Sequence, residues 1–370
     1  MNRHATSFAV LLLALSMGSA EDQADKASLL VPIAEKEGFR VVHLYGTPEE
    51  IGRQHASAFA DEIKLLRKDY LGKYIHSKRD ERETVEGCQA LEPFYLPRHR
   101  AELKALAEAA DMPWDDAVLA TGFLDVNRTV LCSTFVGHDP ESGEPIFGRN
   151  LDFPSLGIAN EHGLCIVYHP SEGHAFASFA YPGMMGVLTG MNDAGLTVAV
   201  MNVFQEKQYQ QAMPYILFFR TLMEECTTTA EVLDRARAGC CNVSNNLMVC
   251  DASGDAVLCE ISPTRVEVRR PKDGLVMSTN HFRSEALGKT FKLCYRYPIL
   301  KWLLEGRDGE IGLDRAIGAL RAVAIWPINL QSFVLLPARR EVHVAMGKVP
   351  ACAGRYVPID LAKEFARPRD

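Results

Sequence analysis

Several features that mark common protein classes are missing from this sequence of 370 residues. No Cys-x-x-Cys pair and no His-Glu-x-x-His run occurs, so two common spacings of zinc ligands are absent. The formal net charge of -7 lacks the basic excess of nucleic-acid-binding domains. Beyond residue 20 the apolar runs are too short to cross a membrane as a helix. We therefore expect no metal or other cofactor, no nucleic-acid partner and no integral membrane segment.

The first twenty residues combine a basic start with an apolar run. Arg3 and His4 precede the apolar stretch 8–15, and small residues at 18–20 suit cleavage by a signal peptidase. A buried first helix is the alternative, but acidic residues follow at once. Residues 1–20 therefore predict a signal peptide, and the mature protein is expected to be secreted, periplasmic or lumenal.

The ten cysteines leave the disulfide pattern open. An oxidising compartment would permit disulfides. If Cys132 is a free nucleophile, nine cysteines remain, and an odd number leaves at least one further thiol free or paired between chains.

The periodicity of apolar residues changes at Cys132. Residues 21–37 are charged and small, typical of an irregular leader, and residues 39–44 predict a strand. A capping box at Thr47-Pro48-Glu49-Glu50 predicts the start of a helix. The spacing of apolar residues from there to residue 131 predicts mainly helices. From Cys132 onward, short strands separated by glycine turns dominate to about residue 205.

The later part of the chain alternates groups of helices with groups of strands. Helices are predicted over 215–225, 229–238 and 311–324, and strands lie between and after them. Groups of strands that alternate with groups of helices, in place of single βαβ units, favour antiparallel sheets flanked by helices. The sequence thus predicts an α+β fold.

Cys132 opens the segment with the clearest chemistry. A thiol attacks only as thiolate, and the pKa of a free cysteine is about 8.5, so a base is needed. A terminal α-amine has a pKa near 8, whereas a peptide nitrogen has no useful basicity. Cleavage of the chain before Cys132 would create such a base within the same residue.

The segment Gly148-Arg149-Asn150-Leu151-Asp152 follows Cys132 after a loop, and a hairpin would bring the two together. Arg149 would then favour the thiolate, and Asp152 would hold the ammonium. The alternative is a core cysteine beside a surface Arg–Asp pair.

These segments resemble the N-terminal-nucleophile (Ntn) hydrolases, specifically the penicillin acyltransferase-like family, which is related to choloylglycine hydrolases and acid ceramidase-like amidases. The resemblance spans about residues 39–345. It rests on the Cys132 and Gly148–Asp152 segments and on three others: 46–52 with His55, 190–196 with Asn245-Asn246, and Ser278-Thr279-Asn280-His281-Phe282.

The resemblance implies a four-layer αββα sandwich, self-cleavage into two chains that stay associated, and attack by cysteine on an acyl carbonyl. It makes Cys132 the nucleophile and Arg149 and Asp152 the pair beside it. It also makes Asn280 and Asn202 the amides that bind the oxyanion. The Asn-Ser-Pro run of choloylglycine hydrolases is replaced by Asn280-His281-Phe282, which favours the acyltransferase branch.

Other residues of the resembling segments stay outside the expected site. Turn or core roles are the simpler interpretation for Asn192, Asn245 and Asn246, and capping or burial for His55 and His281. The late arginine of choloylglycine hydrolases has no secure counterpart; Arg339 and Arg340 are the candidates.

The sequence therefore predicts a secreted, self-processing enzyme that cleaves an acyl amide or transfers the acyl group to an amine through a thioester. Its alternatives are an ester or lipid hydrolase of the phospholipase B-like type and a non-catalytic binding protein. The stretch 181–186 would line an acyl pocket or form a buried turn. The acyl group, the amine, the choice of water or amine as acceptor and the oligomeric state stay open.

The expected boundaries are a signal peptide over 1–20, a mainly helical prosegment or small chain over 21–131, and a catalytic chain over 132–370.

Overall fold

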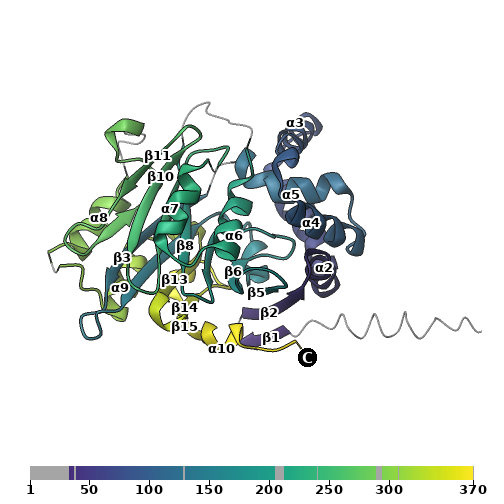
Figure 1. Ribbon diagram of the computed structural model, residues 1–370. Coiled ribbons are helices and arrows are strands. Elements are labelled where there is room, and N and C mark those ends of the chain that lie inside the picture. The colour runs from purple at the N-terminus through teal and green to yellow at the C-terminus, as the bar shows by residue number, and fades with distance from the viewer. Residues whose placement is uncertain are drawn as a thin grey trace, which may run out of the picture. The chain divides into compact units, whose positions relative to one another are not determined.

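The structure, a computed structural model shown in Figure 1, describes most of the chain after residue 32. The expected signal peptide lies outside the described residues and stays a prediction. The described residues are 33–36, 39–127, 130–204, 212–239, 241–288, 294–306 and 308–369.

Helices fill the stretch between the first strands and Cys132. α2 (Pro48–Leu65) begins at the predicted capping box, where the Glu50 carboxylate accepts a hydrogen bond from Thr47 N at 2.8 Å and the Thr47 hydroxyl accepts one from Glu50 N at 3.3 Å. It packs along α4. The other helices of this stretch are α3 (Lys78–Gln89), α4 (Pro97–Ala109) and α5 (Trp114–Val126). The predicted helical character of this part of the chain is confirmed.

The first two described strands correct two expectations. β1 (Ile33–Lys36) lies where an irregular leader is predicted, and it pairs antiparallel with β2 (Phe39–Gly46). β2 in turn pairs in parallel with β5 (Leu164–Pro170), so the prediction of purely antiparallel sheets is wrong at this pair. A parallel pair needs a long crossover connection. Here the connection runs through α2 to α5 and the next two strands.

The described strands form two sheets, with nine strands in the order β1-β2-β5-β6-β7-β8-β9-β10-β11 and six in the order β12-β3-β4-β13-β14-β15. The first sheet continues through β6 (Phe176–Ala180), β7 (Thr189–Asn192), β8 (Thr197–Asn202), β9 (Asn245–Cys250), β10 (Ala256–Ser262) and β11 (Arg265–Arg269). The second comprises β3 (Leu131–His138), β4 (Pro145–Asp152), β12 (Val276–Ser278), β13 (Asn329–Leu336), β14 (Glu341–Ala345) and β15 (Val357–Asp360).

The two sheets pack face to face, and helices cover their outer faces. The rings of Phe179 on β6 and Phe333 on β13 meet with centroids 4.7 Å apart, and β3 contacts β8 and β9. α6 (Tyr215–Glu225) and α7 (Thr229–Arg237) pack on the first sheet, and α8 (Arg296–Leu304) and α9 (Leu313–Val323) pack on the second (Figure 1). The predicted αββα sandwich and its α+β class are thus confirmed. The chain ends after a short helix, α10 (Leu361–Phe365).

Burial on both faces of a strand favours a continuous apolar run. In β5 the run Leu164-Cys165-Ile166-Val167-Tyr168 is wholly buried. The apolar core formed in this way extends across both sheets and fixes their spacing.

The hairpin β3–β4 positions the expected nucleophile. Its turn is closed by Asp139, whose carboxylate accepts hydrogen bonds from Glu141 N and Ser142 N. Cys132 lies opposite Leu151 and Thr134 opposite Arg149, so these side chains share one face of the sheet.

Candidate active site

Cys132 is fully buried, and its backbone is held on both sides. Its N–H donates to Asn280 Oδ1 at 2.7 Å, and its carbonyl oxygen accepts from Arg296 Nη1 at 2.5 Å. Burial raises the pKa of the Cys132 thiol, and the charges of Arg149 and Arg296 offset part of that rise. In the uncut chain Cys132 is therefore a protonated and weak nucleophile.

Arg149 is buried between the two sheets, as the hairpin register requires. Its Nε donates to Thr189 Oγ1 on β7 at 3.3 Å. Neither Nη atom has a hydrogen-bond partner among the described residues. A buried guanidinium with unused donors is costly unless it stabilises a negative charge, and the thiolate of Cys132 is the charge at hand.

Asp152 lies on the other face of the hairpin, toward the loop after α9. Its Oδ1 accepts from Asn329 Nδ2 at 2.9 Å and from Ile325 N at 3.3 Å. Its Oδ2 has no hydrogen-bond partner among the described residues and lies 3.7 Å from Arg296 Nη1. Burial raises the pKa of Asp152 to about 6, against the lowering effect of Asn329 and Arg296. The carboxylate thus has one oxygen free for a further cation.

Asn280, just after β12, connects the residues on either side of the predicted cleavage point. Its Nδ2 donates to Val130 O at 3.1 Å and to Asn202 O at 2.8 Å. Its Oδ1 accepts from Cys132 N and from Arg296 Nη2, the latter at 2.9 Å. One amide side chain therefore holds the backbone both before and after the Leu131–Cys132 bond.

Asn202 and Asn246 support this amide from the first sheet. The Asn202 side chain donates to Asn245 Oδ1 at 3.0 Å and accepts from the Tyr215 hydroxyl at 3.4 Å, while its backbone carbonyl holds Asn280. Asn246 Nδ2 donates to Ser278 Oγ, Thr279 O and His281 O, which fixes the loop on which Asn280 stands. Asn246 therefore has a structural role, which is the simpler of the interpretations given from the sequence.

Arg296 is the site residue that sequence reasoning missed. It stands at the start of α8, is buried, and contacts Cys132, Asn280 and Asp152. The arginines proposed from the sequence lie elsewhere: Arg339 pairs with Glu144, and Arg340 donates to Asp193 O, both at exposed positions. Only the three-dimensional fold brings residue 296 to the hairpin.

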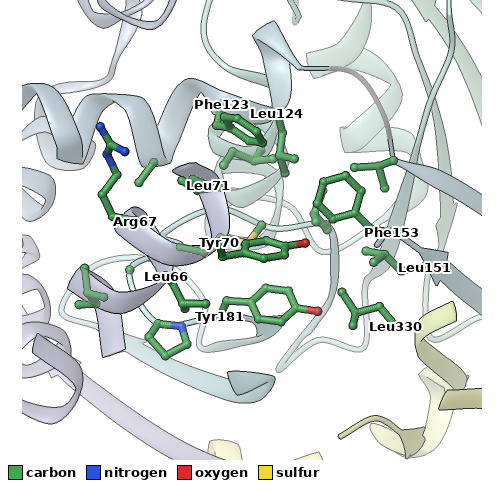
Figure 2. Close-up of a pocket in the computed structure, with 18 of the residues that line it drawn as sticks. Leu66, Arg67, Tyr70, Leu71, Phe123, Leu124, Leu151, Phe153, Tyr181 and Leu330 are labelled. Atoms are coloured by element: carbon green, nitrogen blue, oxygen red, sulfur yellow. The ribbon is translucent and has the colours of Figure 1, made fainter. Parts of the chain in front are cut away.

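An apolar cavity adjoins the site (Figure 2). Val130 lies at its wall, and so does Leu151, which is opposite Cys132 in the hairpin. Figure 2 shows the rings of Tyr70 and Tyr181 one above the other in the cavity, with their hydroxyl groups directed toward Phe153, Leu151 and Leu330. The remaining lining residues are Ile63, Leu66, Arg67, Leu71, Met112, Ala120, Phe123, Leu124, Pro182, Gly183, Met184, Leu188 and Ile216.

Part of the stretch 181–186 lines this cavity, and it does so as a turn. Tyr181, Pro182, Gly183 and Met184 line it, and the turn is held by Gly183 N, which donates to His55 Nε2 at 2.9 Å. Burial lowers the pKa of His55 to about 3, so the imidazole is neutral and serves as an acceptor. His55 thus has a structural role, because it holds this turn.

Within the described ranges, no cluster of three or more histidine, cysteine or acidic side chains is arranged to hold a metal ion. Among the same residues, no helix is long and apolar enough to span a bilayer.

Comparison with known proteins bears on this site. Residues 139–296 match the family model described as acyl-coenzyme A:6-aminopenicillanic acid acyl-transferase. These residues are therefore similar to this acyltransferase family, and the predicted resemblance to penicillin acyltransferases is confirmed. The matched range contains Arg149, Asp152, Asn202, Asn280 and Arg296 and begins after Cys132.

A relative and several solved structures are similar to this chain over longer stretches. An uncharacterised protein from Archaeoglobus fulgidus is 22% identical and covers 82% of this chain, which spans 62% of that protein's length. An N-acylethanolamine-hydrolyzing acid amidase ortholog from Caenorhabditis elegans is 17% identical, with a TM-score of 0.48 over 56% of this chain and 93% of that one. Penicillin V acylase from Agrobacterium tumefaciens is 14% identical, with a TM-score of 0.41 over 63% and 87% of the two chains.

Proposed function

We propose that this chain is a self-processing cysteine Ntn hydrolase that acts on acyl amides with apolar acyl groups, or that transfers such acyl groups to an amine. The observation that carries the proposal is the convergence of Arg149, Asp152, Asn280 and Arg296 on Cys132, beside an apolar cavity. The matched family model, which is named for an acyl transfer, supports the same chemistry.

Self-cleavage is the first step of the proposal. The Cys132 sulfur attacks the Leu131 carbonyl carbon, the C–N bond breaks, and the thiol proton passes to the departing nitrogen. Water then hydrolyses the resulting thioester, which leaves a carboxylate on Leu131 and a free amine on Cys132. That amine has a pKa near 8 and is held next to the sulfur, so it supplies the base that the buried thiol lacks.

The cut also releases the oxyanion donor. In the uncut chain Asn280 Nδ2 is occupied by Val130 O and Asn202 O. Once Val130 is free to leave the site, one N–H of Asn280 is available for a substrate oxygen. An amide N–H aimed at a developing oxyanion contributes about 3 kcal/mol to catalysis in measured cases.

Turnover then follows from the same groups. The Cys132 amine takes the thiol proton, the thiolate attacks the acyl carbon, and Asn280 and Asn202 stabilise the oxyanion. The ammonium, held by Asp152, gives its proton to the departing amine, and an acyl-thioester remains on Cys132. Water or a second amine releases the acyl group, while Arg296 keeps the Cys132 carbonyl and Asn280 in place.

The side chains that line the cavity determine which kind of acyl group we propose for the substrate. The cavity walls are mainly aliphatic and aromatic, and the polar side chains that line it are already engaged. The Tyr70 hydroxyl donates to Pro154 O, the Tyr181 hydroxyl accepts from Gln331 Nε2, and Arg67 pairs with Glu81 and Asp116. A cavity with few free polar groups favours an apolar ligand. We therefore assign it to a hydrocarbon or aryl acyl chain.

The two chains produced by the cut are expected to stay together. β2 of the small chain pairs with β5 along its whole length, and side chains from α2 and α5 form part of the cavity wall. Loss of the small chain would expose this apolar surface to water, at about 25 cal/mol per Å².

An acyl-enzyme trapping experiment tests the proposal. Decanoyl p-nitroanilide and decanoyl p-nitrophenyl ester share one acyl group and differ in the bond broken. Each is mixed with the protein and quenched in acid. We expect release of p-nitroaniline and a decanoyl mass on the peptide that begins at Cys132. Cys226→Ser, which alters another buried thiol, is the matched control and should behave like the parent. Turnover of the ester alone would point to a lipid or ester hydrolase, and turnover of neither to a binding protein.

A further inference from the structure

A second cysteine, Cys294, lies within a cluster of reactive side chains beside the proposed active site. Its Sγ is 3.3 Å from Thr279 Oγ1, and that hydroxyl is 2.9 Å from His281 Nδ1. Cys294 is half-buried and therefore reachable from solvent, whereas His281 is buried. Thr279 and His281 are the immediate neighbours of Asn280, and Cys294 is two residues from Arg296.

The three atoms Sγ, Oγ1 and Nδ1 form a relay for one proton. A threonine hydroxyl donates one hydrogen bond while it accepts another. Cys294 gives its proton to Thr279 Oγ1 as the hydroxyl proton passes to His281 Nδ1, so a thiolate and an imidazolium result with no change in net charge. A thiol coupled to a nearby base is a general feature of activated cysteines.

The electrostatics of the cluster favour the thiolate. Burial acts to raise the pKa of Cys294, but hydrogen bonds from His281 and Thr279 outweigh it and lower the pKa to about 6. By contrast, burial raises the pKa of Cys88, Cys226, Cys250 and Cys352. Cys294 thus has a thiolate at neutral pH that these four thiols lack.

Two arginines add positive charge near the thiol. His281 and Arg296 face it, and Arg283 lies beyond, with its guanidinium 4.1 Å above the Tyr297 ring that meets His281 edge-on. Glu260, the acid that approaches the same loop, is held by Arg269 and by the backbone N–H groups of Arg283 and Ser284. Reagents that carry carboxylates are therefore attracted to Cys294.

We propose that Cys294 is a covalent modification site that exchanges with small disulfides bearing carboxylate groups, such as oxidised glutathione. The Cys294 thiolate attacks one sulfur of the disulfide, a mixed disulfide forms on Cys294, the reagent's S–S bond breaks, and its other half departs as a thiolate that takes a proton from water. The adduct stands against Thr279, His281 and Arg296, so it displaces Asn280. This second consequence rests on the proposed function; the modification itself does not.

The test is chemical and needs no activity. The full-length Cys132→Ala protein is incubated with oxidised glutathione between pH 5 and 9, and each cysteine peptide is followed by mass spectrometry. The rate at Cys294 is expected to rise with a midpoint at about pH 6, while Cys226 and Cys352 stay unmodified. Thr279→Val and, separately, His281→Gln should each move the midpoint toward about 8.5, the value of a free thiol. Thr279→Ser keeps the hydroxyl and should keep the low midpoint. A Cys294 midpoint near 8.5 in the parent, or one unmoved by both substitutions, would overturn the proposal.

The consequence for catalysis is measured on the otherwise unaltered protein. Modified protein should lose acyl-amide turnover, regain it with dithiothreitol, and show no such loss in the Cys294→Ser variant. Full activity with Cys294 fully modified would contradict the coupling to Asn280. Because labelling is read by mass alone, failure of the proposed enzymatic function would leave the labelling result intact and so remain distinguishable.

Discussion

Cys132 and Cys294 both lie against the loop Thr279-Asn280-His281, yet their surroundings shift the pKa of their thiols in opposite directions. Cys132 is fully buried and bonds to Asn280 through its backbone; burial raises the pKa of its thiol. Cys294 is half-buried and bonds to the residues on either side of Asn280 through the hydroxyl of Thr279 and the ring of His281, which lower the pKa of its thiol.

The difference shows that nearby cations alone do not convert a cysteine into a thiolate. Arg149 and Arg296 both act on Cys132, and burial still dominates. At Cys294 the Thr279 hydroxyl relays the proton to the His281 imidazole. Cys132 has no such acceptor in the uncut chain, and the amine released by the proposed cut would supply one for turnover.

The largest difference between the two thiols should appear in turnover. Cys132→Ala removes the atom that forms the thioester, and we expect kcat for an acyl amide to fall by a thousandfold or more, on the order of losses seen for other nucleophiles. Cys294→Ser should retain most of the activity, because Cys294 touches no reacting atom. Steady-state kinetics on the two purified variants decides this, and equal losses would show that the comparison is wrong.

The shared loop gives the next largest effect. Asn280→Ala removes the donor proposed for the oxyanion, and we expect kcat to fall by about 10²–10³. The matched control is Asn192→Ala, because Asn192 is also a buried amide but bonds to Met223 O and Cys226 O away from the site. It should lower the melting temperature and leave the kcat of folded protein near the parent value. A small kcat loss at Asn280 would mean that the oxyanion is bound elsewhere.

Asp152 tests the electrostatic side of the Cys132 site. Its pKa of about 6 exceeds the ordinary 3.8, so the folded protein favours the neutral carboxyl. Stability associated with this group is therefore full below about pH 4 and is lost as the pH rises to about 6. Relative to Asp152→Asn, the parent should lose about 3 kcal/mol of unfolding free energy across that window.

This comparison is made by urea unfolding at pH 4 and pH 7, in the Cys132→Ala background so that no free amine lies near the carboxyl. An unfolding free-energy difference between parent and variant that is the same at both pH values would show that Asp152 is not desolvated as the structure indicates.

The cavity beside Cys132 should give the smallest effect. Ala120 on α5 lines it, and Ala120→Phe places a ring in the space for the acyl chain. We expect the ratio of kcat/KM for decanoyl over butyryl amide to fall by about tenfold. Ala238→Phe, at the exposed end of α7, is the control and should leave this ratio as it is. An unchanged ratio in Ala120→Phe would place the acyl chain outside the cavity.

The sequence predicts best what is local. Cys132, Arg149 and Asp152 lie on one hairpin. Two strand-like segments separated by the turn from Asp139 to Gly143 are enough to predict that hairpin. The capping box before α2 is equally local and is confirmed. Asn280 is found from its place in an ordered set of motifs, and the structure bonds it to Cys132 across 148 residues.

Arg296 and the β2–β5 pair show what local patterns leave out. Arg296 stands on a short helix whose apolar periodicity is weak, and it reaches Cys132 across 164 residues. The parallel pairing of β2 with β5 depends on how four helices and a hairpin pack between them. His281 is expected to be buried from its sequence, and it is, but its bond to Thr279 and the nearness of Cys294 exist only in the fold.

The most direct test of the account is intact-mass measurement with N-terminal sequencing of the purified, active protein, together with its Cys132→Ala variant. The account predicts two chains in the active protein, one of which starts at Cys132 with a free amine, and a single chain in the variant with the Leu131–Ala bond intact. The same spectrum reports whether residues 1–20 have been removed. A fully active protein in which Leu131 is still bonded to Cys132 would contradict the central claim that the new amine activates the thiol.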